Sequence, residues 1–362
     1  MVLIAFLRNN MYNLTPYILE VARTMPSTNP KQTNNNKNYP LLSLDGWYEH
    51  GQLLLENTYL QPFKQTSNGF SKTIRIKENP RNGYIEREIH GAMHASRVAW
   101  SSMMLHKLCQ QHYAVAAESK FNSLLKYLDL KEDDVLCLIR YVALGHDAAR
   151  EGDGYDRWEA ESAEKIQHFF ESHSIETEKA IILSKLASLK DKPKELTEFL
   201  QEQKLSSEAI EGLQYARVLI SLSDCFDIIR CNRLFDFKYI TQKLSEVFDY
   251  EPEKDGSVFF EYAKNLLEII KKQQDLYFPT ELIGFNKETY RLDEGEADYS
   301  PKAKVGLEHA SNAIMAMQIS LQQHPYFAKL LPFESPIEEI ESEVKPAFNP
   351  YIHGTNSSAL GE

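Results

Sequence analysis

The sequence has no long hydrophobic run and only four cysteines among its 362 residues. No apolar stretch approaches the roughly 20 residues that a membrane-spanning helix needs, so we expect a soluble protein without a membrane span. The apolar start is interrupted by Arg8 and is too short for a secretory signal. The cysteines form no Cys-x-x-Cys pair, which indicates reduced thiols in an intracellular protein.

Positive charge is also scarce, because 40 Lys and Arg residues are set against 52 Asp and Glu residues, for a net charge of −12. An acidic protein repels phosphate backbones and anionic membranes, so we expect no nucleic-acid partner. The apolar fraction of 43% is ordinary, and a chain of this length can bury a substantial core. We expect a monomer.

Three regions differ in composition. Residues 1–40 combine a short helical pattern with an Asn-rich loop, 41–335 form the main domain, and 336–362 form an acidic tail that is predicted to be disordered. The fold class is mainly α, with a small β-hairpin in which alternating residues 70–77 pair with 288–292. We expect helices near 47–55, 85–113, 117–129, 132–150, 156–173, 176–189, 206–232, 238–248, 257–275 and 301–323, and a short surface helix within 189–204.

The stretch from 87 to 100 carries His90, His94 and Arg97 at spacings of four and three residues. On a helix these side chains project from one side, where two imidazoles and a guanidinium suit a metal or a phosphate. A solvated polar face explains this stretch equally well when it is considered alone.

A second cluster follows the apolar run 135–145 and contains His146 and Asp147. Adjacent helical residues point about 100° apart, so this pair can bind one metal from neighbouring sides. A carboxylate at the end of a buried helix needs a partner, and Gly145 leaves room for a close approach. A third cluster, Ser-Asp-Cys-Phe-Asp-Ile-Ile-Arg at 223–230, contains Asp224.

The ordered set His…His-Asp…Asp resembles the signature of HD-domain phosphohydrolases over about residues 85–235. The resemblance implies that His94, His146, Asp147 and Asp224 bind one or two divalent metals (Mn, Mg or Fe) that activate water against a phosphoester. The alternative is that these buried polar clusters merely satisfy one another.

A narrower resemblance involves the run His-Asp-Ala-Ala-Arg-Glu-Gly-Asp-Gly-Tyr-Asp-Arg-Trp-Glu at 146–159, together with 90–94 and 224–230. These segments resemble the phosphodiesterase domain of the SidE family of Legionella effectors, which has an HD-like helical fold. The family acts on ADP-ribosylated or phosphoribosyl ubiquitin without a metal, using two histidines and a glutamate. The resemblance implies that His90, with His94 next to it, is the first catalytic histidine, which forms a phosphoramidate, and that Glu159 is the glutamate.

The chain departs from this family at the second catalytic histidine, which acts as acid and base. No histidine lies between His173 and His309, so Ser221, Ser223 or Asp224 fills the position. Losing that proton transfer costs about 10²–10⁴-fold in rate. Three hypotheses are consistent with this departure: a SidE-type phosphodiesterase acting on modified ubiquitin, a metal-dependent HD phosphohydrolase acting on a nucleotide, or a degenerate module that binds ubiquitin or a nucleotide without turnover.

Basic side chains flank all three clusters, and guanidinium groups bind phosphate oxygens in a bidentate manner. The candidate phosphate-binding residues are Arg97, Arg150, Arg157 and Arg230. His146 and Asp224 complete the candidate catalytic set. The Glu-rich segment 338–343 resembles the acidic secretion signal of Legionella effectors, which implies delivery to the host cytosol; without that resemblance we expect a cytoplasmic protein.

Overall fold

The structure is a computed structural model, and it describes residues 40–42, 44–59, 90–150, 157–230, 238–277, 285–286, 291–292 and 313–331. The chain divides into two compact units, Met1–Pro40 and Leu41–Glu362, and every described residue except Pro40 belongs to the second unit. The elements are the 3-10 helix η1 (Pro40–Leu42, which begins at the last residue of the first unit), α3 (Leu44–Thr58), α4 (Ala92–His112), α5 (Ala114–Leu128), α6 (Glu132–Gly145), α7 (Glu159–Ser172), α8 (Thr177–Ser188), α9 (Pro193–Glu202), α10 (Ser207–Ile228), α11 (Lys238–Ser245), α12 (Pro252–Tyr277), β1 (Phe285–Asn286), β2 (Arg291–Leu292), α14 (Ala313–Gln323) and α15 (Pro325–Leu330).

The described residues are mainly helical, which confirms the predicted fold class. The predicted hairpin is not seen, because residues 70–77 lie outside the described residues; among the described residues, Arg291–Leu292 pairs antiparallel with Phe285–Asn286. The two strands of the observed pair are close in the chain, so closing the loop between them costs less entropy than closing one of more than 200 residues. The predicted boundaries of the first region and the acidic tail also lie outside the described residues, apart from Pro40.

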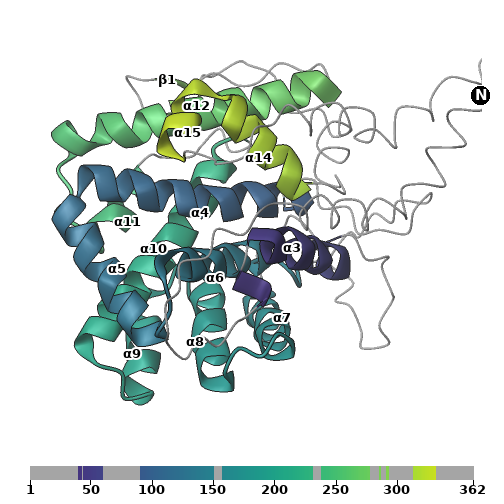
Figure 1. The fold of residues 1–362 in the computed structure, drawn as a ribbon. Coiled ribbons are helices and arrows are strands. Elements are labelled where there is room, and N and C mark those ends of the chain that lie inside the picture. Colours follow the sequence, from purple (N-terminus) through teal and green to yellow (C-terminus); the bar gives the residue numbers. More distant parts are fainter. Residues whose placement is uncertain are drawn as a thin grey trace, which may run out of the picture. The chain divides into compact units, whose positions relative to one another are not determined.

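Helix α4 is the central helix of the described fold. It packs on α6 and α10 on one side and on α14 on another, with α5 following it through a tight connection (Figure 1). Its burial extends around the helix, which is expected of a helix that is covered by neighbours on several sides. Trp100 fixes α14 in place, since its indole Nε1–H donates a 3.0 Å hydrogen bond to the carbonyl oxygen of Ile314.

Helix α6 carries the apolar run 135–145, and every residue of that run is buried. Three acidic residues in its first turn (Glu132, Asp133 and Asp134) favour a helix start there because they lie near the positive end of the helix dipole. At its end, a Cβ atom on Gly145 would lie 2.6 Å from Ile166 Cγ1 of α7. The predicted close approach at this glycine is therefore confirmed, and it brings α7 against the residues that come after α6.

Helix α10 begins at an N-cap, where the hydroxyl of Ser206 accepts a 3.2 Å hydrogen bond from the backbone N–H of Ala209. It packs closely on α5, because a Cβ on Gly212 would lie 2.7 Å from the backbone nitrogen of Leu124. The turn between α8 and α9 also lies against α10, since the guanidinium of Arg217 donates a 2.6 Å hydrogen bond to the carbonyl oxygen of Lys190.

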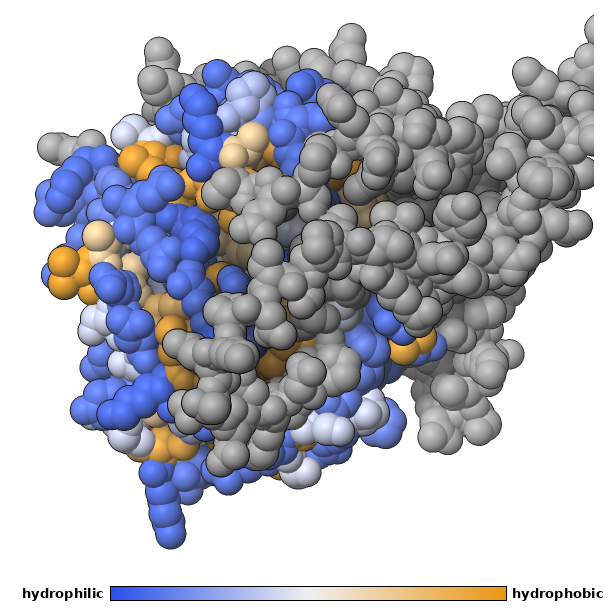
Figure 2. Space-filling model, in the orientation of Figure 1, coloured by the Kyte–Doolittle hydropathy of each residue, from blue (hydrophilic) through white to orange (hydrophobic). Residues whose placement is uncertain are grey.

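On the face shown in Figure 2, the described elements are mainly hydrophilic, with hydrophobic side chains in small separate patches. The exposed large hydrophobic residues of the described part, Leu53, Val115 and Tyr239, belong to different elements, so they give no continuous apolar surface. Within the same part of the chain, no helix combines the length and the apolar character needed to cross a membrane.

Candidate functional site

Three helix ends bring the predicted clusters together. His90 lies two residues before α4 and His94 in its first turn, His146 and Asp147 come after the end of α6, and Asp224 lies in the last turns of α10. His94 is fully buried and His146 is 2% exposed. The cluster is therefore an interior site and not the solvated polar face that the 87–100 stretch alone allowed.

His94 and His146, the two inner histidines, both direct Nε2 toward the centre of the cluster. Nδ1 of His94 lies 2.6 Å from Asp227 Oδ2, and Nδ1 of His146 lies 2.6 Å from the carbonyl oxygen of Ala143. A carboxylate and a carbonyl oxygen only accept hydrogen bonds, so both Nδ1 atoms carry the proton. The two Nε2 atoms, 3.3 Å apart, are therefore left with lone pairs that face each other.

Two carboxylates complete this arrangement. His94 Nε2 lies 3.6 Å from Asp147 Oδ2 and 3.4 Å from Asp224 Oδ1, and His146 Nε2 lies 3.4 Å and 3.6 Å from the same two atoms. An ion with bonds of about 2.1 Å holds neighbouring ligands about 3.0 Å apart in octahedral and about 3.4 Å apart in tetrahedral geometry. These residues therefore fit a divalent metal in donor type and spacing.

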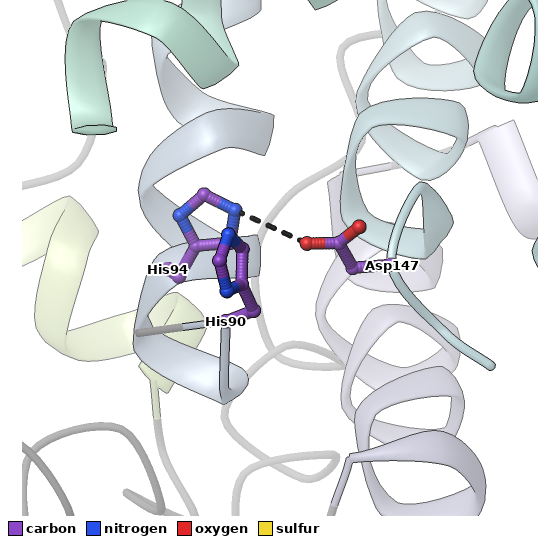
Figure 3. Close-up of side chains that lie close together, drawn as sticks. All are labelled: His90, His94 and Asp147. Carbon is purple, nitrogen blue, oxygen red and sulfur yellow. Dashed lines mark ion pairs between the residues drawn. The ribbon is translucent and has the colours of Figure 1, made fainter. Parts of the chain in front are cut away.

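His90 borders the same cluster. Its ring centroid lies 5.1 Å from that of His94 at an interplanar angle of 77°, and the side chain is 6% exposed. Figure 3 shows the imidazole of His94, on α4, and that of His90, which lies just before the helix, beside Asp147. Ligand atoms of His90, His94 and Asp147 all lie within 4.8 Å of one another, and so do those of His94, His146 and Asp224, so two candidate donor sets share His94.

Four buried cations surround the carboxylates. Asp227 pairs with Arg97, whose Nε lies 2.5 Å from Oδ1, and with Arg230, whose Nη1 lies 3.1 Å from Oδ2. Arg150 Nη1 lies 3.5 Å from Asp147 Oδ1. Lys190 supplies the fourth positive charge, because its Nζ lies 2.8 Å from Asp224 Oδ2.

These contacts shift the pKa values of the inner groups strongly. Burial lowers the pKa of His146, but Asp147 and Asp224 outweigh burial and raise it to about 9. The pKa of His94 also rises well above its usual value, since Asp147, Asp224 and Asp227 outweigh its burial. Burial raises the pKa of Asp224, yet Lys190 and the imidazoles hold it well below its usual range. Without a bound metal, His94 and His146 can therefore share a proton between their Nε2 atoms.

Lys190 is held in its charged form. Burial lowers its pKa, but the carboxylates of Asp224, Asp191 and Asp147 outweigh burial and raise the pKa well above its usual value. The neighbouring carboxylates therefore favour the charged ammonium form of Lys190 beside Asp224.

Glu159 and Arg157 are less closely connected to the cluster. Glu159 begins α7, is partly exposed, and pairs with Lys192 at 2.6 Å; Lys192 and Lys190 belong to the same turn. Arg157 is exposed and makes no hydrogen bond or ion pair with another described residue. The catalytic role of Glu159 and the phosphate-binding role of Arg157 stay predictions, and Tyr155 in the same motif lies outside the described residues.

Of the three candidates for the missing histidine position, Asp224 faces the cluster. Ser221 donates to Asp191 Oδ1 at 2.6 Å, and Ser223 donates to the carbonyl oxygen of Leu219 within its own helix. Both hydroxyls are therefore engaged elsewhere, while Asp224 Oδ1 lies opposite both inner imidazoles.

Asp227 and Lys190 are site residues that the sequence reasoning missed. Asp227 lies three residues after Asp224, so helical spacing could have indicated that both face α4. Lys190 lies in a charged segment that was interpreted as a surface connection. Only the packing of that turn on α10 brings its ammonium group to Asp224.

A comparison with known families gives one match: the family model of the SidE phosphodiesterase (PDE) domain matches residues 58–292, which is more than half of the chain. The matched range contains all of the site residues described above. No curated protein and no solved structure matches this chain.

Proposed function

Because the chain belongs to the SidE phosphodiesterase domain family, we propose that it cleaves a phosphoester of ADP-ribosylated or phosphoribosyl ubiquitin. The family match is the observation that carries this proposal. It also supports the proposal that the protein is a Legionella effector delivered to the host cytosol. Cleavage would occur either at the pyrophosphate of ADP-ribosylated ubiquitin or at the phosphoribosyl-serine linkage.

The geometry of the cluster supports phosphoester chemistry. Three buried guanidinium groups and one ammonium group lie around three carboxylates, which favours an anionic ligand over a neutral one. His90 borders the cluster and could act as the nucleophile, as the family resemblance implies. The pair His94 and His146, with facing Nε2 atoms 3.3 Å apart, could hold and transfer the proton that the missing histidine would otherwise handle.

A metal-dependent HD phosphohydrolase is the second candidate. The observation that favours it is that His94 Nε2 and His146 Nε2 lie 3.3 Å apart and each lies 3.4–3.6 Å from a carboxylate oxygen of Asp147 and of Asp224, with both Nε2 lone pairs directed inward. A divalent metal held there would supply Lewis-acid activation of water and of the phosphoryl oxygen. Asp227 and the Ala143 carbonyl would orient the two imidazoles through their Nδ1–H groups.

Intact-mass spectrometry of ADP-ribosylated ubiquitin distinguishes the two candidates. The modified ubiquitin is incubated with the protein in the presence of a chelator and, separately, with added manganese. Loss of the AMP mass in chelator supports SidE-type chemistry, and turnover only with manganese moves the assignment to the metal-dependent class. An unchanged mass in both conditions, for ADP-ribosylated and phosphoribosyl ubiquitin alike, contradicts the proposed activity and leaves a binding module.

Two variants link any activity to the cluster. We expect His90→Gln and Glu159→Gln each to lower kcat by about 10²-fold or more if they act as nucleophile and positioning carboxylate. His168→Gln is the matched control, since His168 is an exposed histidine of α7. Equal activity of His90→Gln and the control would refute the role of His90.

A further inference from the structure

Lys190 is a buried lysine whose ammonium group has two hydrogen-bond acceptors among the described residues. It lies in the turn between α8 and α9 and is 8% exposed. Its Nζ donates to Asp224 Oδ2 at 2.8 Å and to Asp191 Oδ2 at 3.0 Å. An ammonium group has three N–H donors, and acceptors among the described residues engage two of them. Within the described part of the chain, one donor of this buried ammonium group is therefore left for a ligand.

The turn that carries Lys190 is fixed on one face of α10. Arg217 donates to the carbonyl oxygen of Lys190 at 2.6 Å, and Ser221 donates to Asp191 Oδ1 at 2.6 Å. Arg217, Ser221 and Asp224 succeed one another at four and three residues, so they share a helix face. The position of the ammonium group is thus set by main-chain and side-chain contacts before any ligand arrives.

Asp224 connects Lys190 to the inner histidines. Its Oδ2 accepts from Lys190, while its Oδ1 lies 3.4 Å from His94 Nε2 and 3.6 Å from His146 Nε2. The Asp224 carboxylate therefore lies between the ammonium group of Lys190 and both imidazoles. With Lys190 on Oδ2, Asp224 is turned so that Oδ1 faces the centre of the cluster.

We propose that Lys190 is the fixed cation of this site, which orients Asp224 and donates its remaining N–H to a phosphoryl oxygen of the substrate. The inference rests on the proposed function, because it takes the ligand to be a phosphoester. An ammonium group fixed at this place by Asp224 and Asp191 attracts an anion and repels a divalent cation. Lys190 therefore biases the cluster toward the phosphoester and against a metal, although the donor atoms alone fit a metal.

Isothermal titration calorimetry of the full chain tests this with two separate probes, ADP-ribose and manganese chloride. We expect Lys190→Gln and Lys190→Met to bind ADP-ribose at least tenfold more weakly and manganese about tenfold more tightly. Lys190→Arg, which keeps the charge, should retain most of the ADP-ribose affinity. The control is Lys243→Met, because Lys243 contacts Asp191 Oδ1 from α11 and has no hydrogen bond to Asp224 in the described part of the chain.

Circular dichroism melts identify a temperature at which every variant is folded, and the titrations are run there. Lys190→Gln removes the charge but keeps a hydrogen-bond donor for Asp224. Loss of affinity for both probes would indicate a merely structural role and overturn the proposal. Unchanged ADP-ribose affinity in the Lys190 variants would overturn it as well. A wild-type protein that does not bind ADP-ribose would overturn the proposed phosphoester site together with it.

Discussion

Replacing Asp227 by asparagine removes the anion that lies between two buried arginines and the inner histidine. Asp227 and Arg97 are 0% exposed and Arg230 is 2% exposed, so water cannot solvate the guanidinium groups once the carboxylate charge is gone. The asparagine oxygen could still accept a hydrogen bond from His94 Nδ1 or from an arginine, but the amide carries no charge. Two positive charges would then be buried without their shared anion.

Breaking a buried ion pair by removing one partner costs about 3–5 kcal/mol. We therefore expect Asp227→Asn to lower the free energy of unfolding by about 4 kcal/mol and the Tm by roughly 10 °C. Urea unfolding followed by circular dichroism at pH 7 measures the first quantity, and a thermal melt measures the second.

Asp255→Asn is the matched control for this experiment. Asp255 is also buried, but it accepts from His112, from Tyr113 and from the backbone N–H of Glu251, with no arginine among its partners in the described residues. Its loss should cost about 1–2 kcal/mol, the value of ordinary and charge-assisted hydrogen bonds. A cost below about 1 kcal/mol for Asp227→Asn, or one no larger than the control, would refute the charge argument.

Three further predictions concern packing, protonation and metal binding. Gly212→Ala should destabilise the fold by about 1–3 kcal/mol in urea unfolding, because its Cβ would meet the Leu124 backbone. Burial lowers the pKa of His106 to about 3, so the folded protein keeps this imidazole neutral, whereas the unfolded chain protonates it below its usual pKa of 6.5. The free energy of unfolding therefore falls as the pH drops from 7 to 5, and His106→Gln should remove about 2 kcal/mol of that fall. Manganese affinity should rise between pH 6 and pH 8 in calorimetry, because metal binding must displace the His146 proton, whose pKa is about 9.

Each of these has a clear contrary result. Gly256→Ala is the control for Gly212→Ala, since a Cβ there meets only the Tyr250 hydroxyl at 3.3 Å; equal costs would contradict the packing argument. A pH dependence of stability that is unchanged in His106→Gln would mean that another group causes the acid loss. Manganese affinity that does not vary with pH would mean that His146 is neutral in the metal-free protein.

Local patterns were sufficient for the helices and for part of the site. The apolar run 135–145 and its acidic start specified α6, and the spacing of His90 and His94 specified a common helix face. The ordered motif was also sufficient to indicate the family, because the three blocks lie within the matched residues 58–292. The β pairing was not determined in this way, because period-two alternation specifies a strand but not its partner; Arg291–Leu292 pairs with Phe285–Asn286, and residues 70–77 lie outside the described residues.

Local features of the chain were therefore enough to indicate the helical class, the family and the four donors His94, His146, Asp147 and Asp224. The packing of the helices brings these donors together, sets which imidazole nitrogen His94 and His146 present, and adds Asp227 and Lys190 to the site. The physical reason is that donor type and helical phase are local properties of the chain. The charge balance of a buried site, in contrast, depends on which distant segments pack against it.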